Sequence, residues 1–199
     1  MLIATHNRGK IREYRELLRE LCSQLVGLDD VGITEQAEET GDSFAENALA
    51  KARAYAQLSG HVTLADDSGL EVDALCKRPG VYSARYGGPG LTDEQRYLKL
   101  LTELEDLGAA DRRARFRCAI AVAWPDGRCA LTTGSCEGEI ASEPLGANGF
   151  GYDPVFYIPE YQRTMAELPE TIKNRISHRA RAARAMVELL RNCTAGPEL

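Results

Sequence analysis

Short apolar runs alternate with amphipathic helical patterns along most of this chain, and this order constrains the fold more than any other feature. An apolar run at 2–5 precedes a helical pattern at 9–22, in which apolar residues recur three and four positions apart. A second helical pattern at 43–59 ends at Gly60, and an apolar run at 61–65 follows it. Strands that alternate with helices are typical of an α/β fold, so we expect a mixed, twisted central sheet flanked by helices.

Two capping boxes and one hairpin add detail to this pattern. The stretches 43–46 and 92–95 each place a Ser or Thr three residues before a Glu or Gln, which marks the start of a helix. In the second of these helices we expect the inward-facing side chains to be Tyr97, Leu98, Leu101 and Leu104. Residues 115–124 alternate apolar and polar side chains, and 128–135 follow a Pro-Asp-Gly turn, which predicts a hairpin.

Size and composition limit the class of protein. The chain has 199 residues, of which 44% are hydrophobic, enough for one domain (1–199) with a substantial core. No apolar run approaches the ~20 residues that span a bilayer, and the first residues lack the basic start of a secretion signal, so we expect a cytoplasmic protein that does not bind membranes. The 6 cysteines form no Cys-x-x-Cys pair and are expected to be reduced, and the net charge of −6 argues against broad nucleic-acid binding.

The loop between the first strand and the first helix has the composition of an anion site. It reads Thr5-His6-Asn7-Arg8-Gly9-Lys10. Backbone N–H groups at a helix start favour an anion together with the helix dipole, and Lys10 adds a positive charge in the first turn. Since it contains a single glycine, the loop is not a P-loop, and an ordinary capped turn is the alternative to a phosphate site.

Two adjacent acids, Asp66 and Asp67, follow the apolar run at 61–65. A divalent cation would offset their repulsion, and oxygen ligands without His or Cys favour Mg²⁺ over Zn²⁺. At the carboxyl end of a strand, where α/β folds bind ligands, one of these acids could also orient or deprotonate a water molecule. The alternatives are a turn capped by Asp side chains and, for Glu38 and Glu39, exposed acids ahead of a helix.

A glycine-rich loop at 146–154 carries two aromatic side chains, Phe150 and Tyr152. Its three glycines allow close approach of the backbone, and an aromatic ring on such a loop can stack on a nucleobase. The alternative is a loop whose aromatic side chains anchor the core.

The last part of the chain is basic. From 173 to 191 there are six Lys or Arg residues against one acid. Ser177 is a candidate N-cap for the last helix, which places His178 and Arg179 at the end where the dipole disfavours cations. This local conflict indicates a site for oxygen acceptors such as phosphate, whereas a solvated helix face is the alternative.

Together these segments resemble the inosine triphosphate pyrophosphatase family from Ile3 to about Leu190. The motifs that carry the resemblance are THNRGK (5–10), EETG (38–41), ENALAKA (46–52), ADDSGLEVDAL (65–75), PGVYSARY (79–86), FGYDP (150–154) and ISHR (176–179). The resemblance implies two lobes with a nucleotide cleft between them. It also implies Mg²⁺-dependent hydrolysis of ITP, dITP and XTP to the monophosphate and pyrophosphate, which would cleanse the nucleotide pool and prevent misincorporation into DNA and RNA.

The resemblance implies a role for each site residue. The substrate would be bound by Thr5, His6, Asn7, Arg8, Gly9, Lys10, Ser68, Phe150, Gly151, Tyr152, Asp153, Lys173, His178 and Arg179. Within this set the first loop would hold the triphosphate, Phe150 would stack on the base, and the last three residues would read it. The metal would be held by Glu38, Glu39 and Asp67. Asp67 would also be the catalytic base or would orient the attacking water, with Asp66 in support.

Two features bear on affinity and selectivity. His6 stands where the family usually has Gly, so its side chain must point away from the phosphates or narrow the pocket. ITP and XTP carry a carbonyl acceptor at the purine 6-position, whereas ATP carries an amino donor. Because Arg179 can only donate, we expect adenine to be disfavoured by ~1–3 kcal/mol or more.

Three other functions stay open on the sequence alone. The chain could be a related nucleotide pyrophosphatase for a modified pyrimidine or methylated guanine triphosphate, a non-catalytic nucleotide sensor, or an RNA-binding module that uses its basic last helix. The resemblance also implies a homodimer, and the apolar and Arg side chains of residues 80–86 suit an interface or a pocket wall.

Overall fold

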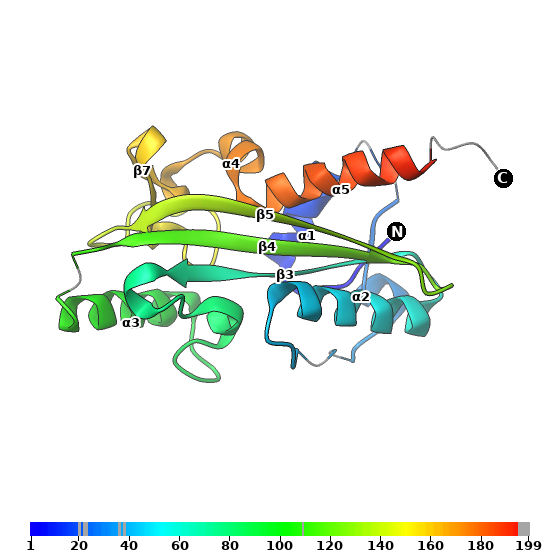
Figure 1. Cartoon of the computed structure of the whole chain (residues 1–199), viewed down its shortest axis with the longest axis horizontal. Helices are drawn as coiled ribbons and strands as arrows, with labels where there is room; N and C mark the ends of the chain where they lie inside the picture. The colour runs from blue at the N-terminus through cyan, green and yellow to red at the C-terminus, as the bar shows by residue number, and fades with distance from the viewer. Residues whose placement is uncertain (20, 22–23, 36, 38, 109, 195–199) are drawn as a thin grey trace. The chain divides into compact units, whose positions relative to one another are not determined.

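The computed structural model describes residues 1–19, 21, 24–35, 37, 39–108 and 110–194 (Figure 1). Within these residues the strands are β1 (Leu2–Ile3), β2 (Val26–Gly27), β3 (Thr63–Val72), β4 (Arg113–Ala123), β5 (Cys129–Ile140), β6 (Phe156–Ile158) and β7 (Arg163–Thr164). The α-helices are α1 (Arg8–Leu17), α2 (Phe44–Ser59), α3 (Asp93–Asp106), α4 (Glu170–Ile176) and α5 (His178–Thr194). Short 3₁₀ helices are η1 (Asp29–Val31), η2 (Asp73–Leu75), η3 (Gly80–Arg85), η4 (Asp153–Val155), η5 (Pro159–Tyr161) and η6 (Met165–Glu167).

The strands form one sheet in the order β2-β1-β3-β4-β5-β6-β7. β1 pairs in parallel with β2 and β3, whereas β6 pairs antiparallel with β5 and β7. The mixed α/β sheet that the sequence predicts is therefore confirmed. The chain divides into two compact units, of which the first comprises Met1–Asp67, Cys118–Gly134 and His178–Leu199, and the second Ser68–Arg117 and Ser135–Ser177.

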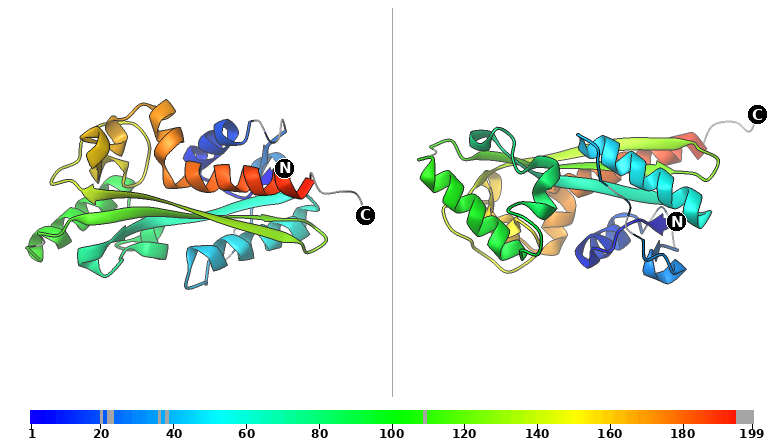
Figure 2. Two further views of the ribbon diagram at one scale, coloured as in Figure 1. Left: turned by 45° about the horizontal axis from the view of Figure 1, so that its top comes forward. Right: turned by 90° about the horizontal axis from the view of Figure 1, so that it is seen from below.

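The first unit has three layers, with its strands between α2 on one face and α1 and α5 on the other (Figure 1). Along β4 the side chains alternate between two cores, so that Ala121 packs with the α2 side and Ile120 with the α1 and α5 side. Both faces are covered, which explains why every residue from Cys118 to Ala123 is buried. The left view of Figure 2 shows α1 beside α5 on their shared face.

Helix α2 forms as its sequence predicts. Ser43 accepts a hydrogen bond from the Glu46 N–H, and the Glu46 side chain accepts one from the Ser43 N–H, so the capping box is confirmed. The helix ends at Gly60, whose φ of 68° lies in the left-handed region that glycine adopts without strain. Helix α1 ends at Leu17, short of the predicted 9–22, and three residues of that range (20, 22 and 23) lie outside the described part.

The second unit packs α3 against its own strands. Leu100 and Leu104 of α3 are fully buried in a core that includes Phe116 and Phe156, whose ring centroids lie 4.5 Å apart. The prediction that Leu98 faces inward is wrong, because this side chain is 44% exposed. At about 100° per residue, Leu98 lies beside the apolar stripe, whereas Leu100 lies on its edge.

Strand β3 differs most from the sequence-based expectation. The predicted strand at 61–65 ends before the two acids, but β3 runs from Thr63 to Val72 and contains them. The strand that ends before the two acids is the neighbouring strand β1, whose last residue, Ile3, pairs with Leu64 of β3. Asp66 and Asp67 therefore lie beyond the carboxyl end of β1, where a sheet of parallel strands exposes ligand-binding groups. Among the described residues, no helix combines the length and the apolar character that crossing a membrane requires.

Candidate active site

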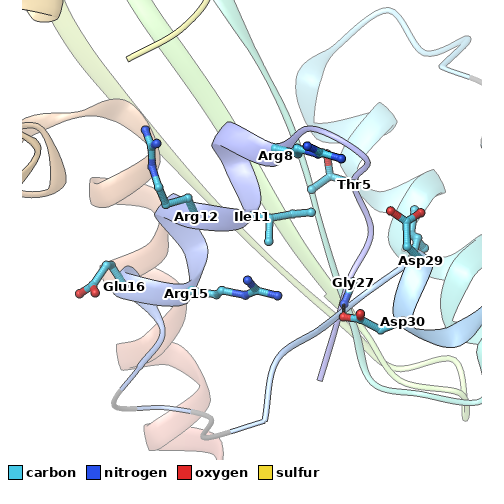
Figure 3. Close-up of a pocket in the computed structure, with 10 residues that line it drawn as sticks. Thr5, Arg8, Ile11, Arg12, Arg15, Glu16, Gly27, Asp29 and Asp30 are labelled. Atoms are coloured by element: carbon cyan, nitrogen blue, oxygen red, sulfur yellow. Dashed lines mark hydrogen bonds between the residues drawn. The ribbon is translucent and has the colours of Figure 1, made fainter. Parts of the chain in front are cut away.

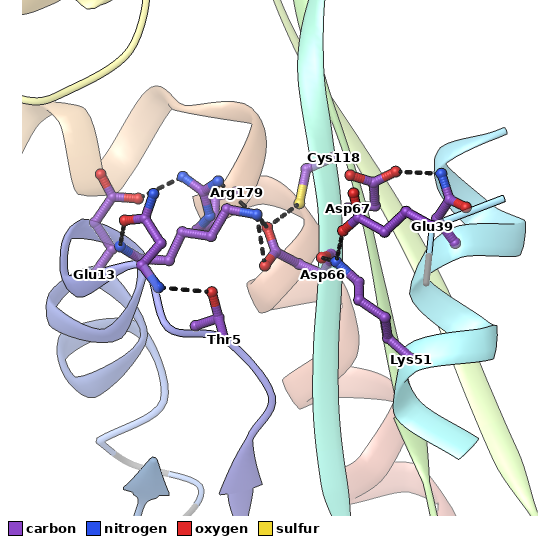
Figure 4. A network of polar contacts seen from close by, with 11 residues as sticks. Thr5, Glu13, Glu39, Lys51, Asp66, Asp67, Cys118 and Arg179 are labelled. Atoms are coloured by element: carbon purple, nitrogen blue, oxygen red, sulfur yellow. Dashed lines mark hydrogen bonds and ion pairs between the residues drawn. The ribbon is translucent and has the colours of Figure 1, made fainter. Parts of the chain in front are cut away.

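The extended backbone of β3 sends the two neighbouring carboxylates to opposite faces of the sheet (Figure 4). Asp66 points to the side of α1 and α5, and Asp67 points to the side of α2. Both side chains are buried, since Asp66 is 2% and Asp67 6% exposed. Two buried carboxylates must be compensated, and the two faces compensate them in different ways.

Asp66 is surrounded by cations. The Lys10 ammonium donates to its carboxylate at 3.0 Å, and the Arg179 guanidinium donates at 3.3 Å. Burial alone would raise the pKa of Asp66, but the positive charges of Lys10, Arg179 and Lys51 outweigh burial and hold this pKa well below its ordinary value. Asp66 is therefore an ionised carboxylate at neutral pH.

Arg179 connects α5 to α1 and β3. Its Nη1 donates to Glu13 at 2.7 Å and its Nη2 donates to Asp66, and the residue is 2% exposed. Burial would lower the pKa of the guanidinium, but Asp66 and Glu13 more than offset this effect, so the pKa rises further. On the same face, burial followed by the charge of Asp66 raises the pKa of the Cys118 thiol to about 12, so this cysteine is a neutral packing group.

The surroundings of Asp67 differ from those of Asp66. Its Oδ2 accepts a hydrogen bond from the Asn47 amide at 2.9 Å. Burial raises the pKa of Asp67 above its ordinary value; Lys51 and Asn47 oppose this shift, and the negative charge of Glu39 adds to it. A carboxylate with a raised pKa accepts a proton more readily, so this side of the strand suits general base chemistry.

Lys51 links Glu39 to the backbone of β3. Its ammonium donates to Glu39 at 2.6 Å and to the backbone carbonyl of Asp66 at 2.6 Å, and the residue is 8% exposed. Burial would lower the pKa of Lys51, but Asp66 and Glu39 raise it by more, so the side chain stays charged.

The sequence reasoning missed Glu13, Asn47 and Lys51. Asn47 and Lys51 are four residues apart on α2 and lie next to the alanines that face the sheet. A polar residue at a helix position that periodicity assigns to the core indicates a buried polar contact, because a buried polar group needs a hydrogen-bond partner. This signal could have identified Asn47 and Lys51 from the sequence.

The loop at 5–10 begins α1 as predicted. Asn7 is the N-cap, and its side chain accepts from the Lys10 N–H at 3.1 Å, while Thr5 accepts from the Asn7 N–H at 3.1 Å. His6, the departure from the family pattern, points outward, with Nδ1 3.3 Å from a carboxylate oxygen of Asp29. Its ring therefore does not fill the space next to Lys10 and Asp66.

The glycine-rich loop belongs to the second unit. Asp153 accepts from the Phe150 N–H at 2.8 Å and from the Lys173 ammonium at 2.6 Å, and both charged side chains are buried. The Lys173 ammonium also lies 4.7 Å from the centroid of the Phe150 ring. Tyr152 is a core residue whose hydroxyl donates to the Ser83 carbonyl at 2.9 Å. Thus Phe150 is the ring that the loop presents, and its neighbours fix its position.

The remaining predicted site residues divide between the units. His178 is buried at the start of α5 in the first unit. Ser68 belongs to the second unit and is half-buried on β3, and the backbone N–H of Gly151 donates to Asp93 at 2.8 Å. Glu38 lies outside the described residues. Within the first unit, hydrogen bonds join Thr5 and Asn7 to the start of α1, Lys10 and Arg179 to the Asp66 carboxylate, and Glu39 through Lys51 to the Asp66 carbonyl next to Asp67.

A mixed α/β sheet with buried acids and lysines beyond the carboxyl end of its parallel strands is the architecture of an α/β protein with a ligand site at that edge. A model of the Ham1 family matches residues 1–189, and the chain belongs to that family.

Curated relatives match over nearly their full length. A protein of Desulforamulus reducens called dITP/XTP pyrophosphatase is 49% identical over 190 residues, which cover 96% of this chain and 94% of the relative. A Bacillus subtilis protein with the same name is 47% identical over 189 residues, covering 95% and 96%.

Solved structures agree with this assignment. A HAM1 protein from Coxiella burnetii superimposes with a TM-score of 0.88 at 44% identity, covering 96% of this chain and 98% of the other. The Staphylococcus aureus Ham1 protein gives a TM-score of 0.85 at 41% identity, covering 96% and 97%.

Proposed function

We propose that the chain is a nucleoside-triphosphate pyrophosphatase that hydrolyses ITP, dITP and XTP to the monophosphate and pyrophosphate. The names of relatives that are 47–49% identical over nearly the full chain support this activity. The observation that carries the proposal is the difference in pKa between the two adjacent acids of β3. Asp66 is neutralised by cations, while Asp67 has a raised pKa, which is the separation that acid–base catalysis needs.

The described residues fit a Mg²⁺ ion on the Asp67 side. Glu39 and Asp67 supply carboxylate oxygens, and the negative charge of Glu39 contributes to the raised pKa of Asp67. They form no cluster of three metal-binding side chains with another described residue, but Mg²⁺ commonly uses one or two carboxylates together with substrate phosphates. When bound there, the ion would neutralise charge that develops on the phosphates.

The chain's own residues would carry the reaction as follows. Lys10 and the backbone N–H groups at the start of α1 bind the triphosphate, and Asn47 orients the Asp67 carboxylate. Asp67 takes a proton from the attacking water. The water oxygen forms a bond to the α-phosphorus, the bond from that phosphorus to the bridging oxygen breaks, and pyrophosphate leaves with the electron pair. The proton stays on Asp67 until solvent removes it.

We assign the purine contact to the Phe150 loop of the second unit. The ring is half-buried and is held by a backbone hydrogen bond to Asp153 and by the Lys173 ammonium. Stacking on such a ring is worth roughly 1–3 kcal/mol per base. The contact of Arg179 with a base stays a prediction, since in this structure both of its terminal nitrogens donate to carboxylates.

The test is pyrophosphate release from ITP, dITP, XTP, ATP and GTP, with and without Mg²⁺. We expect rapid release from the first three, at least ~10-fold less from ATP because its 6-amino group opposes a donor, and loss of activity without metal. Comparable turnover of ATP and ITP would contradict the proposed substrate class. Faster turnover of a methylated guanine or modified pyrimidine triphosphate would favour the related-enzyme alternative. Tight ITP binding without release would favour a sensor.

We also propose a homodimer that uses the surface of η3. Tyr82 in this element is 56% exposed, and the Arg85 guanidinium lies 5.0 Å from its ring centroid. Exposed aromatic and Arg side chains are enriched at interfaces. Sedimentation of Tyr82→Glu against the parent protein tests this surface, and an unchanged mass for the variant would exclude it.

A further inference from the structure

A second pocket lies on the outer side of α1 in the first unit (Figure 3). Its volume is about 600 Å³, which falls in the ~300–1,000 Å³ range of small-molecule sites. One wall carries Arg8, Arg12 and Arg15 of α1, and the opposite wall carries Asp29 and Asp30 of the segment that follows β2.

The pocket and the carboxylate centre use different faces of α1. Arg8, Arg12 and Arg15 recur at helical spacing and share one face. Lys10 and Glu13 lie on the other face, where they contact Asp66 and Arg179. Two of the predicted substrate-binding residues, Thr5 and Arg8, also line the pocket.

The arginine wall also carries one acid, Glu16, whose carboxylate lies 4.0 Å from the Arg19 guanidinium. Arg8 and Arg15 are exposed, and neither forms an ion pair with any residue that the structure describes. In Figure 3 the Arg8 and Arg15 side chains extend from α1 toward the Thr5 and Gly27 wall. A guanidinium group matches phosphate oxygens in charge and in hydrogen-bonding geometry.

The aspartate wall supplies hydrogen-bond acceptors. Asp30 accepts from the Gly27 N–H at 2.8 Å, which fixes its carboxylate at the pocket edge. The Asp29 side chain is 85% exposed, 3.3 Å from His6. Ionised carboxylates only accept hydrogen bonds, so they suit hydroxyl groups and repel a second phosphate. A pair of sugar hydroxyls provides such donors.

We propose that this pocket binds the pentose phosphate part of a ligand, with the phosphate on Arg8 and Arg15 and the sugar hydroxyls on Asp29 and Asp30. A nucleotide and a free sugar phosphate share this chemistry. The site goes beyond the proposed hydrolysis, because it uses the face of α1 opposite Lys10.

The test is a titration of the ¹⁵N-labelled protein followed by NMR, with ribose 5-phosphate, ADP and inorganic phosphate as probes. We expect ribose 5-phosphate to shift the amides of Gly27, Asp29 and Asp30. Arg15→Gln should weaken binding about tenfold through the loss of a charge-assisted contact. Arg53→Gln is the control, since this arginine lies on α2, is exposed and does not line the pocket. It should change affinity less than twofold.

The other probes identify the source of the ligand and the limits of the proposal. ADP binding at least as tight as that of ribose 5-phosphate supports a nucleotide, and weaker ADP binding supports a free sugar phosphate. Inorganic phosphate that binds as tightly as ribose 5-phosphate would overturn the role of the aspartates and the ligand class. Shifts confined to residues near Lys10 and Asp66, or equal effects of the two arginine variants, would overturn the site itself. None of these outcomes affects pyrophosphate release from ITP, so the two proposals fail separately.

Discussion

On the face of β3 that α1 and α5 cover, Asp66 accepts hydrogen bonds from Lys10 and Arg179. On the face that α2 covers, Asp67 accepts a hydrogen bond from the Asn47 amide, and the opposite charges of Lys51 and Glu39 both act on it. The two aspartates have the same side chain, are adjacent in sequence and are both nearly inaccessible to solvent. Their pKa values nevertheless move in opposite directions. The helices on each face, and not the acids themselves, therefore decide which carboxylate has a lowered pKa and which has a raised pKa.

Asp67→Asn should give the largest effect on function. An Asn side chain keeps the size and the hydrogen bond from Asn47 but cannot take a proton at neutral pH. We expect kcat for pyrophosphate release from ITP to fall by ~10³ or more, with stability nearly unchanged. Steady-state kinetics and urea denaturation check both statements. Turnover within tenfold of the parent rate would remove Asp67 from the reaction.

Asp66→Asn should act mainly on stability. It leaves the buried charges of Lys10 and Arg179 without their shared carboxylate, and breaking a buried ion pair in this way costs ~3–5 kcal/mol. Asp126→Asn, at the exposed hairpin turn, is the control and should leave the free energy of unfolding nearly unchanged. If urea denaturation gave the same free energy of unfolding for both variants, the Asp66 carboxylate would not be what stabilises the buried charges of Lys10 and Arg179.

Lys51→Met should weaken the Asp67 side without breaking the fold. The variant removes the ammonium that holds Glu39 and the backbone carbonyl of Asp66, so the acids of this face lose their alignment. We expect kcat to fall by roughly 10²-fold, as for other small misplacements of reacting groups. Arg53→Gln, two residues further along α2 and exposed, is the matched control and should stay within twofold. Equal activities of the two variants would contradict a positioning role for Lys51.

Gly134→Ala should disturb the Asp66 face alone and by the smallest amount. An added Cβ would meet the His178 carbonyl oxygen at 2.3 Å and the Ala182 nitrogen at 2.6 Å, so α5 must move away from the sheet. Overpacking of this kind costs typically ~1–3 kcal/mol. Gly27→Ala is the control, because its nearest neighbour would be 3.6 Å away. A Gly134→Ala protein as stable as the Gly27→Ala protein would show that α5 tolerates the shift.

Local patterns predicted the elements and the identity of the acids. The capping box of α2 and the cap of α1 involve residues three apart, so they are visible in the sequence and appear in the structure. The position of Asp66 and Asp67 inside β3 was not visible. A strand continues through charged residues only where other elements compensate them, and here the compensating residues come from 15 to 113 positions away.

The burial of Arg179 was the least readable feature of the site. Its basic neighbourhood predicts exposure, and only the ion pairs with Glu13 and Asp66 reverse this expectation. The distances of 166 and 113 residues in sequence place both partners beyond any local pattern. Lys51, by contrast, lies in the α2 motif, where its position beside the alanine stripe could have marked it as buried.

The most direct test of the difference between the two faces is an NMR titration of the Asp66 and Asp67 side-chain carboxyl carbons in the metal-free protein. Asp66 should stay ionised at pH values well below the ordinary aspartate pKa, because Lys10 and Arg179 stabilise its charge. Asp67 should take up its proton at a pH above that ordinary value, because burial disfavours its charged form. Protonation of Asp66 at a higher pH than Asp67 would contradict the assignment of Asp67 as the reactive acid.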